Sequence, residues 1–341
     1  MESDAVTLLE AIRQGTLATF PAGKITAAAL TRRNASGNTP LHAAAKHGLL
    51  RQLPPALLTR DHLTLRNDAG YTPLHHAALG GHLDQVPAAL LVAENLGLSS
   101  NAGITVFHSA AASGFLHQVP PGLLTASAVL NRSGVGNTLL HEAAENGTLD
   151  RMPSAFLTPG NLATRNLGGE TVLHVAAFNG HLDQIPAFLL TTEALREQTS
   201  AGDTVFHAAA ISGHLRQVPP ALLTAGNLTV ASKSGFTAIH AAAETGQLGR
   251  IPPAQLTTEL LLTRNDNGDT PLHAAAAEGH LDQIPAELLT RAATGARNYQ
   301  GLTVAALAKQ SGHFAQIPRH ARPLPPGLIG WLLGLFLPGG K

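Results

Sequence analysis

Residues 268–281 read GDTPLHAAAAEGHL, and versions of this stretch recur every 33 residues along the 341-residue chain. The histidine of the motif keeps this spacing in eight frames: His42, His75, His108, His141, His174, His207, His240 and His273. No insertion interrupts the frame from about residue 4 to residue 318. A fixed period of this length indicates a repeat protein, in which each unit buries its apolar face against its neighbours.

One repeat reads as a helix followed by less regular structure. Thr270 suits the N-cap, Pro271 suits the first helical position, and Gly279 suits a left-handed residue at the C-terminal end. The packing stripe of this helix is predicted to consist of Leu272, Ala275 and Ala276.

A proline column follows the same period: Pro21, Pro54, Pro87, Pro120, Pro153, Pro186, Pro219, Pro252, Pro285 and Pro318. A proline in a helix interior costs about 3 kcal/mol, so ten would cost on the order of 30 kcal/mol. That exceeds the usual stability of a domain, about 5–15 kcal/mol. We therefore expect a short helical turn such as HLDQI (280–284), a bend, and each proline in the first turn of a new helical segment.

Three segments resemble the ankyrin repeat family: GNTPLHAAAKHG (37–48), GYTPLHHAALGGHL (70–83) and GDTPLHAAAAEGHL (268–281). The resemblance implies an all-α, ankyrin-like repeat solenoid of stacked helix-turn-helix units that binds protein partners. In the family the second helix normally contains no proline. We interpret the chain as a bacterial-type variant whose second helix is broken by proline into two short pieces, and its high Ala, Arg, Leu and Gly content also favours a GC-rich bacterial source.

The frame divides the chain into three parts. We predict an N-terminal capping repeat at 1–36, ankyrin-like repeats at 37–318 and a Pro/Gly-flanked hydrophobic tail at 319–341. Within the tail, residues 328–337 are apolar on all sides. A ten-residue helix is about 15 Å long, half of the roughly 30 Å core of a bilayer. This segment is therefore predicted to dock on the last repeat, to self-associate, or to lie at a membrane surface.

Composition excludes several classes of function. The net charge is zero, with 22 basic and 22 acidic residues, and aromatic residues make up 4%, so we expect no nucleic-acid partner. The chain has no cysteine, which excludes disulfides and thiolate metal sites. No Walker loop, zincin helix or nucleophile elbow is present. We predict a monomeric non-enzyme without cofactor or metal. The N-terminus lacks a signal-peptide pattern, which predicts a cytoplasmic protein, with a membrane-peripheral protein or secreted effector as the alternative.

The eighteen histidines are interpreted as structural. Stacked helices lie about 8–10 Å apart, so consecutive column histidines cannot share one ion at bond lengths of about 2 Å. In the family this histidine ties the turn to the helix start by hydrogen bonds. A second set opens the next segment and is predicted to cap or pack: His82, His181, His214, His280 and His313.

An arginine column lies just before the turns: Arg33, Arg66, Arg132, Arg165, Arg264 and Arg297. We expect these guanidinium groups to bond backbone carbonyls of the turns. An anionic partner is the alternative interpretation.

Columns that vary between frames are predicted to face outward and to contact the partner. The expected concave face of inner helices and turns comprises Asn38, Tyr71, His76, Leu79, Ile104, Glu142, Glu145, Glu170, Phe178, Asp203, Ile211, Phe236, Asp269 and Leu302. The predicted function is a non-catalytic protein-protein interaction scaffold with a pre-organised surface. The alternative is a membrane-associated adaptor or host-directed effector anchored by residues 328–337.

Overall fold

The computed structural model describes residues 2–324, so the predicted tail segment 328–337 lies outside the described residues. The chain divides into two compact units, Met1–Leu190 and Thr191–Lys341. Between residues 2 and 324 the regular elements are α-helices and 3-10 helices. None of the helices in this range has the length and apolarity needed to cross a bilayer.

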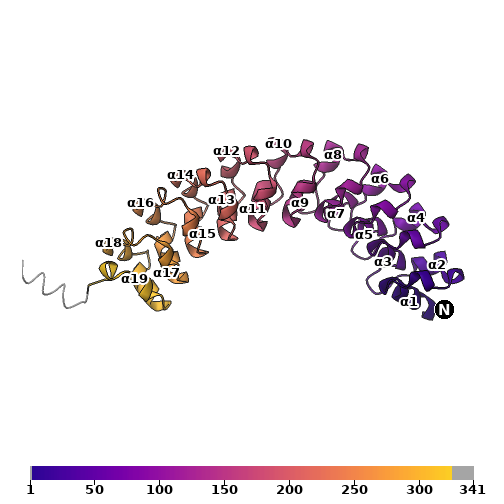
Figure 1. Ribbon diagram of the computed structural model, residues 1–341, viewed down its shortest axis with the longest axis horizontal. Helices are drawn as coiled ribbons and strands as arrows, with labels where there is room; N and C mark the ends of the chain where they lie inside the picture. The colour runs from indigo at the N-terminus through magenta and orange to yellow at the C-terminus, as the bar shows by residue number, and fades with distance from the viewer. Residues whose placement is uncertain (1, 325–341) are drawn as a thin grey trace, which may run out of the picture. The chain divides into compact units, whose positions relative to one another are not determined.

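Each repeat opens with its longest helix, and consecutive first helices pack on one another within a unit (Figure 1). In the first unit they are α1 (Glu2–Arg13), α3 (Pro40–Lys46), α5 (Pro73–Gly80), α7 (Val106–Ala112), α9 (Leu139–Asn146) and α11 (Val172–Asn179). In the second unit they are α13 (Val205–Ile211), α15 (Ala238–Glu244), α17 (Pro271–Glu278) and α19 (Val304–Gln310). The predicted all-α fold of stacked helix pairs is confirmed.

A short α-helix near the end of each repeat forms a second row in each unit (Figure 1). In the first unit these helices are α2 (Ala27–Thr31), α4 (Arg60–Leu63), α6 (Ala93–Leu96), α8 (Ala126–Val129) and α10 (Pro159–Leu162). In the second unit they are α12 (Thr192–Arg196), α14 (Ala225–Leu228), α16 (Thr258–Leu261) and α18 (Arg291–Thr294).

3-10 helices connect the two rows. In the first unit they are η1 (Leu17–Thr19), η2 (Ala22–Lys24), η3 (Leu50–Gln52), η4 (Pro55–Leu57), η5 (Leu83–Gln85), η6 (Ala88–Leu90), η7 (Leu116–Gln118), η8 (Pro121–Leu123), η9 (Leu149–Arg151), η10 (Ser154–Phe156), η11 (Leu182–Gln184) and η12 (Ala187–Leu189). In the second unit they are η13 (Leu215–Gln217), η14 (Pro220–Leu222), η15 (Leu248–Arg250), η16 (Leu281–Gln283), η17 (Phe314–Gln316) and η18 (Arg319–Ala321).

The second half of a typical repeat holds three short helical pieces, so the expectation of two is wrong. Between α5 and α7 the pieces are η5, η6 and α6. The third piece forms because a threonine acts as the N-cap of a new short helix in most repeats. In α4, for example, Thr59 Oγ1 accepts from the backbone N–H of His62 (3.3 Å). A side-chain oxygen that satisfies a free N–H in this way stabilises even a one-turn helix.

The prolines lie between helical pieces and never inside a continuous helix, as predicted. Their position differs by one residue from the expected first turn: Pro87, with φ −52° and ψ 128°, directly precedes η6. Val86 before it is extended (φ −76°, ψ 136°), because a proline ring clashes with a helical preceding residue. The helical structure is therefore interrupted at two residues, the proline and the residue before it. After Pro252 and Pro285, turns replace the 3-10 helix.

The first helices are built as the sequence predicts. In α17 Thr270 and His273 form a capping box, Pro271 is the first residue, and Gly279 adopts the left-handed conformation at φ 81°. The predicted stripe is fully buried: Leu272, Ala275 and Ala276. Alanine at two of the three stripe positions allows close approach of neighbouring helices.

The glycine after each first helix also meets the next repeat. A Cβ built on Gly279 would lie 2.7 Å from the His313 ring, and one on Gly147 would lie 2.7 Å from the His181 ring. The second histidine set thus packs on the preceding repeat, as predicted for these two members. Only glycine combines a positive φ with this approach.

A glutamine column bridges the same loops and was not predicted. Gln184 Nε2 donates to the Gly147 carbonyl (2.9 Å), and its Oε1 accepts from Leu149 N–H (2.9 Å). Gln118 and Gln316 make the same pair of bonds to Gly81 with Leu83 and to Gly279 with Leu281. Each glutamine satisfies backbone groups that the end of a helix leaves free.

The last described residues cover the end of the second unit. Thr294 Oγ1 donates to the Ala321 carbonyl (2.5 Å), and Arg291 Nε donates to the Arg322 carbonyl (3.1 Å). The Arg322 guanidinium lies 5.3 Å from the centre of the Phe314 ring. Residues 319–322 therefore close the α18 side of this repeat.

We predict that Gly279→Ala lowers the free energy of unfolding by more than Gly213→Ala. Both glycines have positive φ, and a left-handed alanine costs about 1–2 kcal/mol. Gly213 has no atom within 4 Å of a built Cβ, whereas Gly279 meets His313. Urea unfolding of both variants measures the difference. The excess should disappear in a His313→Ala background, and an excess unchanged by His313→Ala would contradict the ring contact.

Candidate functional site

The start of each first helix from α3 to α17 is held by one histidine. Thr72 N–H donates to His75 Nδ1 (3.1 Å), and the Thr72 hydroxyl lies 2.8 Å from the same nitrogen. Because Nδ1 accepts from the backbone, the ring proton is on Nε2, which donates to the Ile104 carbonyl in the next repeat (3.0 Å). One neutral imidazole thus caps a helix and fastens the following turn, the role that the family resemblance implies.

The same Nε2–carbonyl bond recurs between sequential repeats. The pairs are His42–Tyr71, His75–Ile104, His108–Asn137, His141–Glu170, His207–Phe236, His240–Asp269 and His273–Leu302, at 3.0–3.2 Å. Every acceptor is the turn residue that varies between frames. The histidine ring bonds only the backbone carbonyl of the turn residue, so the side chain of that residue can vary without loss of the bridge.

Burial keeps these imidazoles neutral. Desolvation lowers the pKa of His42, His75 and His141 from 6.5 to about 4, against the opposing effect of the backbone hydrogen bond. Burial also lowers the pKa of His108, His207, His240 and His273. Within residues 2–324, no group of three or more His, Asp or Glu side chains is placed to hold a metal ion.

All eight predicted turn residues are half-buried: Asn38, Tyr71, Ile104, Glu170, Asp203, Phe236, Asp269 and Leu302. Several have side-chain partners inside the protein. Asn38 and Asp269 each accept from the asparagine amide of the following turn (2.8 Å). Glu170 accepts from Asn166 (2.8 Å), and the Tyr71 ring packs edge-on against His75 at 5.3 Å. These side chains therefore lie along the turn surface, in contact with neighbouring residues of the protein.

The predicted residues on the first helices divide into two kinds. Leu79, Phe178 and Ile211 are exposed, at 41%, 53% and 45% of their surface. Glu145 is also exposed. Two others are held in place: His76 packs edge-on against His42 at 5.1 Å, and Glu142 accepts from Asn137 (3.2 Å).

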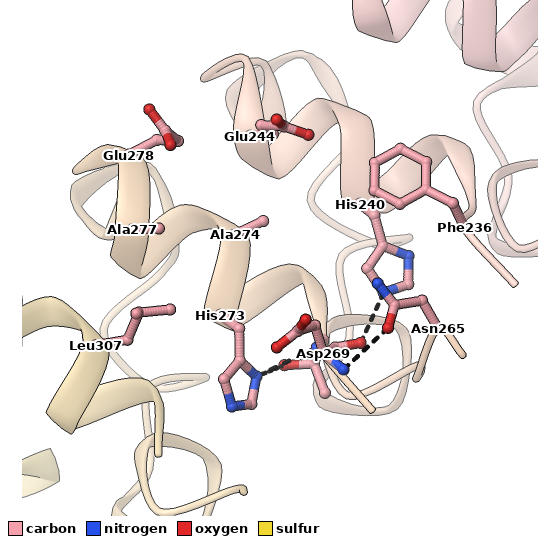
Figure 2. A pocket seen from close by; sticks show the side chains of 11 residues that line it. Phe236, His240, Glu244, Asn265, Asp269, His273, Ala274, Ala277, Glu278 and Leu307 are labelled. Carbon is pink, nitrogen blue, oxygen red and sulfur yellow. Dashed lines mark hydrogen bonds between the residues drawn. The ribbon is translucent and has the colours of Figure 1, made fainter. Parts of the chain in front are cut away.

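The second unit contains a groove along α15 and α17 with a volume of about 230 Å³ (Figure 2). It brings together two predicted residues, Phe236 and Asp269, at the turn end. Glu244 and Glu278 lie at the other end, where the two helices finish. Ala274, Ala277 and Leu307 line the groove between them. The arrangement offers an apolar floor between acidic ends.

The arginine column forms hydrogen bonds within and between repeats. Arg33 and Arg264 each donate to the carbonyl of the corresponding arginine one repeat later, at 2.7 Å. Arg264 also donates to Gly268 in its own turn (2.8 Å). Arg33 additionally pairs with Asp68. The prediction that these guanidinium groups bond turn carbonyls is confirmed.

Exposed apolar residues at the turn tips were missing from the predicted set. Val135 and Leu167 are exposed on adjacent repeats, and Leu167 N–H donates to the Val135 carbonyl (3.1 Å). Tyr299 is an exposed tip residue in the second unit. The sequence could have indicated these residues, because the tip positions vary between repeats as strongly as the positions that we predicted to contact a partner.

Comparison with known proteins supports the assignment of the repeats. The family model described as Ankyrin repeat matches residues 36–53 and 267–299. No curated protein matches the chain. The matched segments contain two of the capping boxes described above, those of α3 and α17.

We predict that acid weakens the fold before the carboxylates titrate. The unfolded chain protonates its histidines near pH 6.5, whereas folded His42, His75 and His141 resist protonation to about pH 4. Their stabilising contribution is complete above pH 6.5 and is lost as the pH falls toward 4, up to roughly 3 kcal/mol each. The urea midpoint should therefore fall between pH 6.5 and 4.5.

Glu142 provides a control for this titration. Burial raises its pKa, so protonation of Glu142 favours the folded state and opposes the loss. Glu142→Gln should make the fall of the midpoint steeper. A midpoint that stays constant over this range would contradict the neutral-histidine assignment.

Proposed function

We propose, from the ankyrin repeats that this chain contains, that it is a non-catalytic scaffold whose first-helix and turn face binds a protein partner. The single observation that carries the proposal is the hydrogen-bond bridge from seven column histidines to the variable turn residue of the next repeat. This bridge fixes the backbone of a surface whose side chains vary between repeats. Such a surface loses little conformational freedom when it binds.

Exposed apolar side chains are the proposed anchors of the interface. Leu79 and Phe178 stand on first helices of the first unit, and Ile211 stands on α13 of the second unit, each with about half of its surface free. Burying a leucine or phenylalanine side chain contributes about 1.5–3 kcal/mol. Glu145 and the half-buried turn residues would supply the polar surroundings and the specificity.

Replacement of the three apolar anchors is expected to abolish partner capture. We predict that the full chain carrying Leu79→Ala, Phe178→Ala and Ile211→Ala loses at least tenfold of the captured partner in quantitative pull-down. The matched control is Phe188→Ala, because Phe188 is 78% exposed but belongs to η12, outside the first-helix row. Equal capture by the triple variant and the wild type would refute the assignment of the face.

The alternative function places residues 328–337 at a membrane surface. The sequence LIGWLLGLFL supports it, since it is apolar and contains the single tryptophan. Liposome flotation of the full chain against a chain that ends at Pro323 separates the two proposals. Loss of flotation on truncation would support the membrane-associated form, and equal partitioning would remove it.

A further inference from the structure

The groove of the second unit is a hollow because its central side chains are small. Ala274 and Ala277 occupy positions that hold larger side chains on two first helices of the other unit. The corresponding residues are His76 and Leu79 on α5 and Val175 and Phe178 on α11. With about 230 Å³, the hollow is smaller than typical small-molecule pockets of about 300–1,000 Å³. Its size suits one long side chain.

The charged side chains that line the groove are all acidic: Glu244, Asp269 and Glu278. Glu244 and Glu278 are exposed, and neither carboxylate has an ion-pair or hydrogen-bond partner among the residues that the structure describes. Asp269 closes the turn end and bonds only neutral groups, among them the Asn298 amide. Within residues 2–324, no lysine or arginine lines the groove. Arg264 lies on the nearby turn, where its guanidinium donates to two backbone carbonyls.

The two histidines of the groove do not offset these carboxylates. Burial lowers the pKa of His240 and of His273, which keeps both rings neutral at pH 7. Each Nε2 is also engaged with a carbonyl, at 3.1 Å and 3.2 Å. The groove therefore combines net negative charge with an apolar floor and the phenyl ring of Phe236 (Figure 2).

We propose that this groove binds an arginine side chain of a polypeptide partner. The aliphatic stem of arginine would pack on Ala274, Ala277 and Leu307, as such stems do on apolar surfaces. Its guanidinium would lie between the carboxylates of Glu244 and Glu278, which suit its planar donor geometry. The inference rests on the proposed function and specifies the chemistry of the partner.

The test uses a phage-displayed library of random 12-residue peptides selected on the full-length protein. The comparison variant is Glu244→Gln with Glu278→Gln, which keeps shape and removes charge at two exposed positions. The matched control is Phe188→Ala in η12, outside the first-helix row. We expect selected peptides to share an arginine beside apolar residues and to bind the double variant at least tenfold more weakly than the control.

Synthetic versions of a selected peptide make the test specific. Replacing its arginine by citrulline, which has the same shape without the charge, should lower affinity at least tenfold. Raising the ionic strength should weaken binding of the arginine peptide more than that of the citrulline peptide. Selected peptides that lack a basic residue, or that bind the double variant as tightly as the wild type, would overturn the inference and leave the scaffold function intact. A selection that enriches no peptide at all would count against both proposals.

Discussion

The imidazole that links one repeat to the next is the interaction on which the structure depends. In seven frames the column histidine donates from Nε2 to a carbonyl 29 residues later, and in six of these its Nδ1 accepts a hydrogen bond from the threonine backbone N–H. A buried polar group with both nitrogens satisfied avoids the cost of an unpaired one, about 1–3 kcal/mol. The same ring caps its own helix and positions the next turn, so local and inter-repeat structure form together.

Two further constraints follow from residues with unusual backbones. Proline forces the residue before it to be extended, which divides the second half of the repeat into short pieces. Glycine accepts the left-handed conformation after the first helix and leaves room for the ring of the next repeat. Together they explain why the repeat contains one regular helix and then a chain of single turns.

The fold was largely predictable from the sequence because the period repeats the same signals many times. Thr270, Pro271 and Gly279 each have the role that local capping rules assign. The third helical piece was missed, although the threonine that precedes it was visible as a column. A helix of only four residues after a threonine N-cap is too short to show a helical periodicity in the sequence.

The candidate site was less predictable, because variability shows that a position tolerates change but not how its side chain lies. Tyr71 was expected to project and instead packs on His75. The groove depends on small residues, Ala274 and Ala277, and a search for large anchors passes over alanine. Glu244 and Glu278 lie at the C-terminal ends of α15 and α17, and the sequence alone does not show that these two ends are close together.

The spacing of the inter-repeat bonds has a consequence for how such a gene can change. Partners of the recurring histidine, arginine and glutamine bonds lie 29, 33, 35 and 37 residues apart, in each case between one repeat and the next. Within a unit, removing or duplicating one complete period would recreate every junction with new neighbours. An insertion or deletion that is one residue longer or shorter than a period would place a wrong group opposite each donor at the junction with the neighbouring repeat. Recombination between copies is therefore tolerated in whole periods, and array length can evolve independently of the residues that contact a partner.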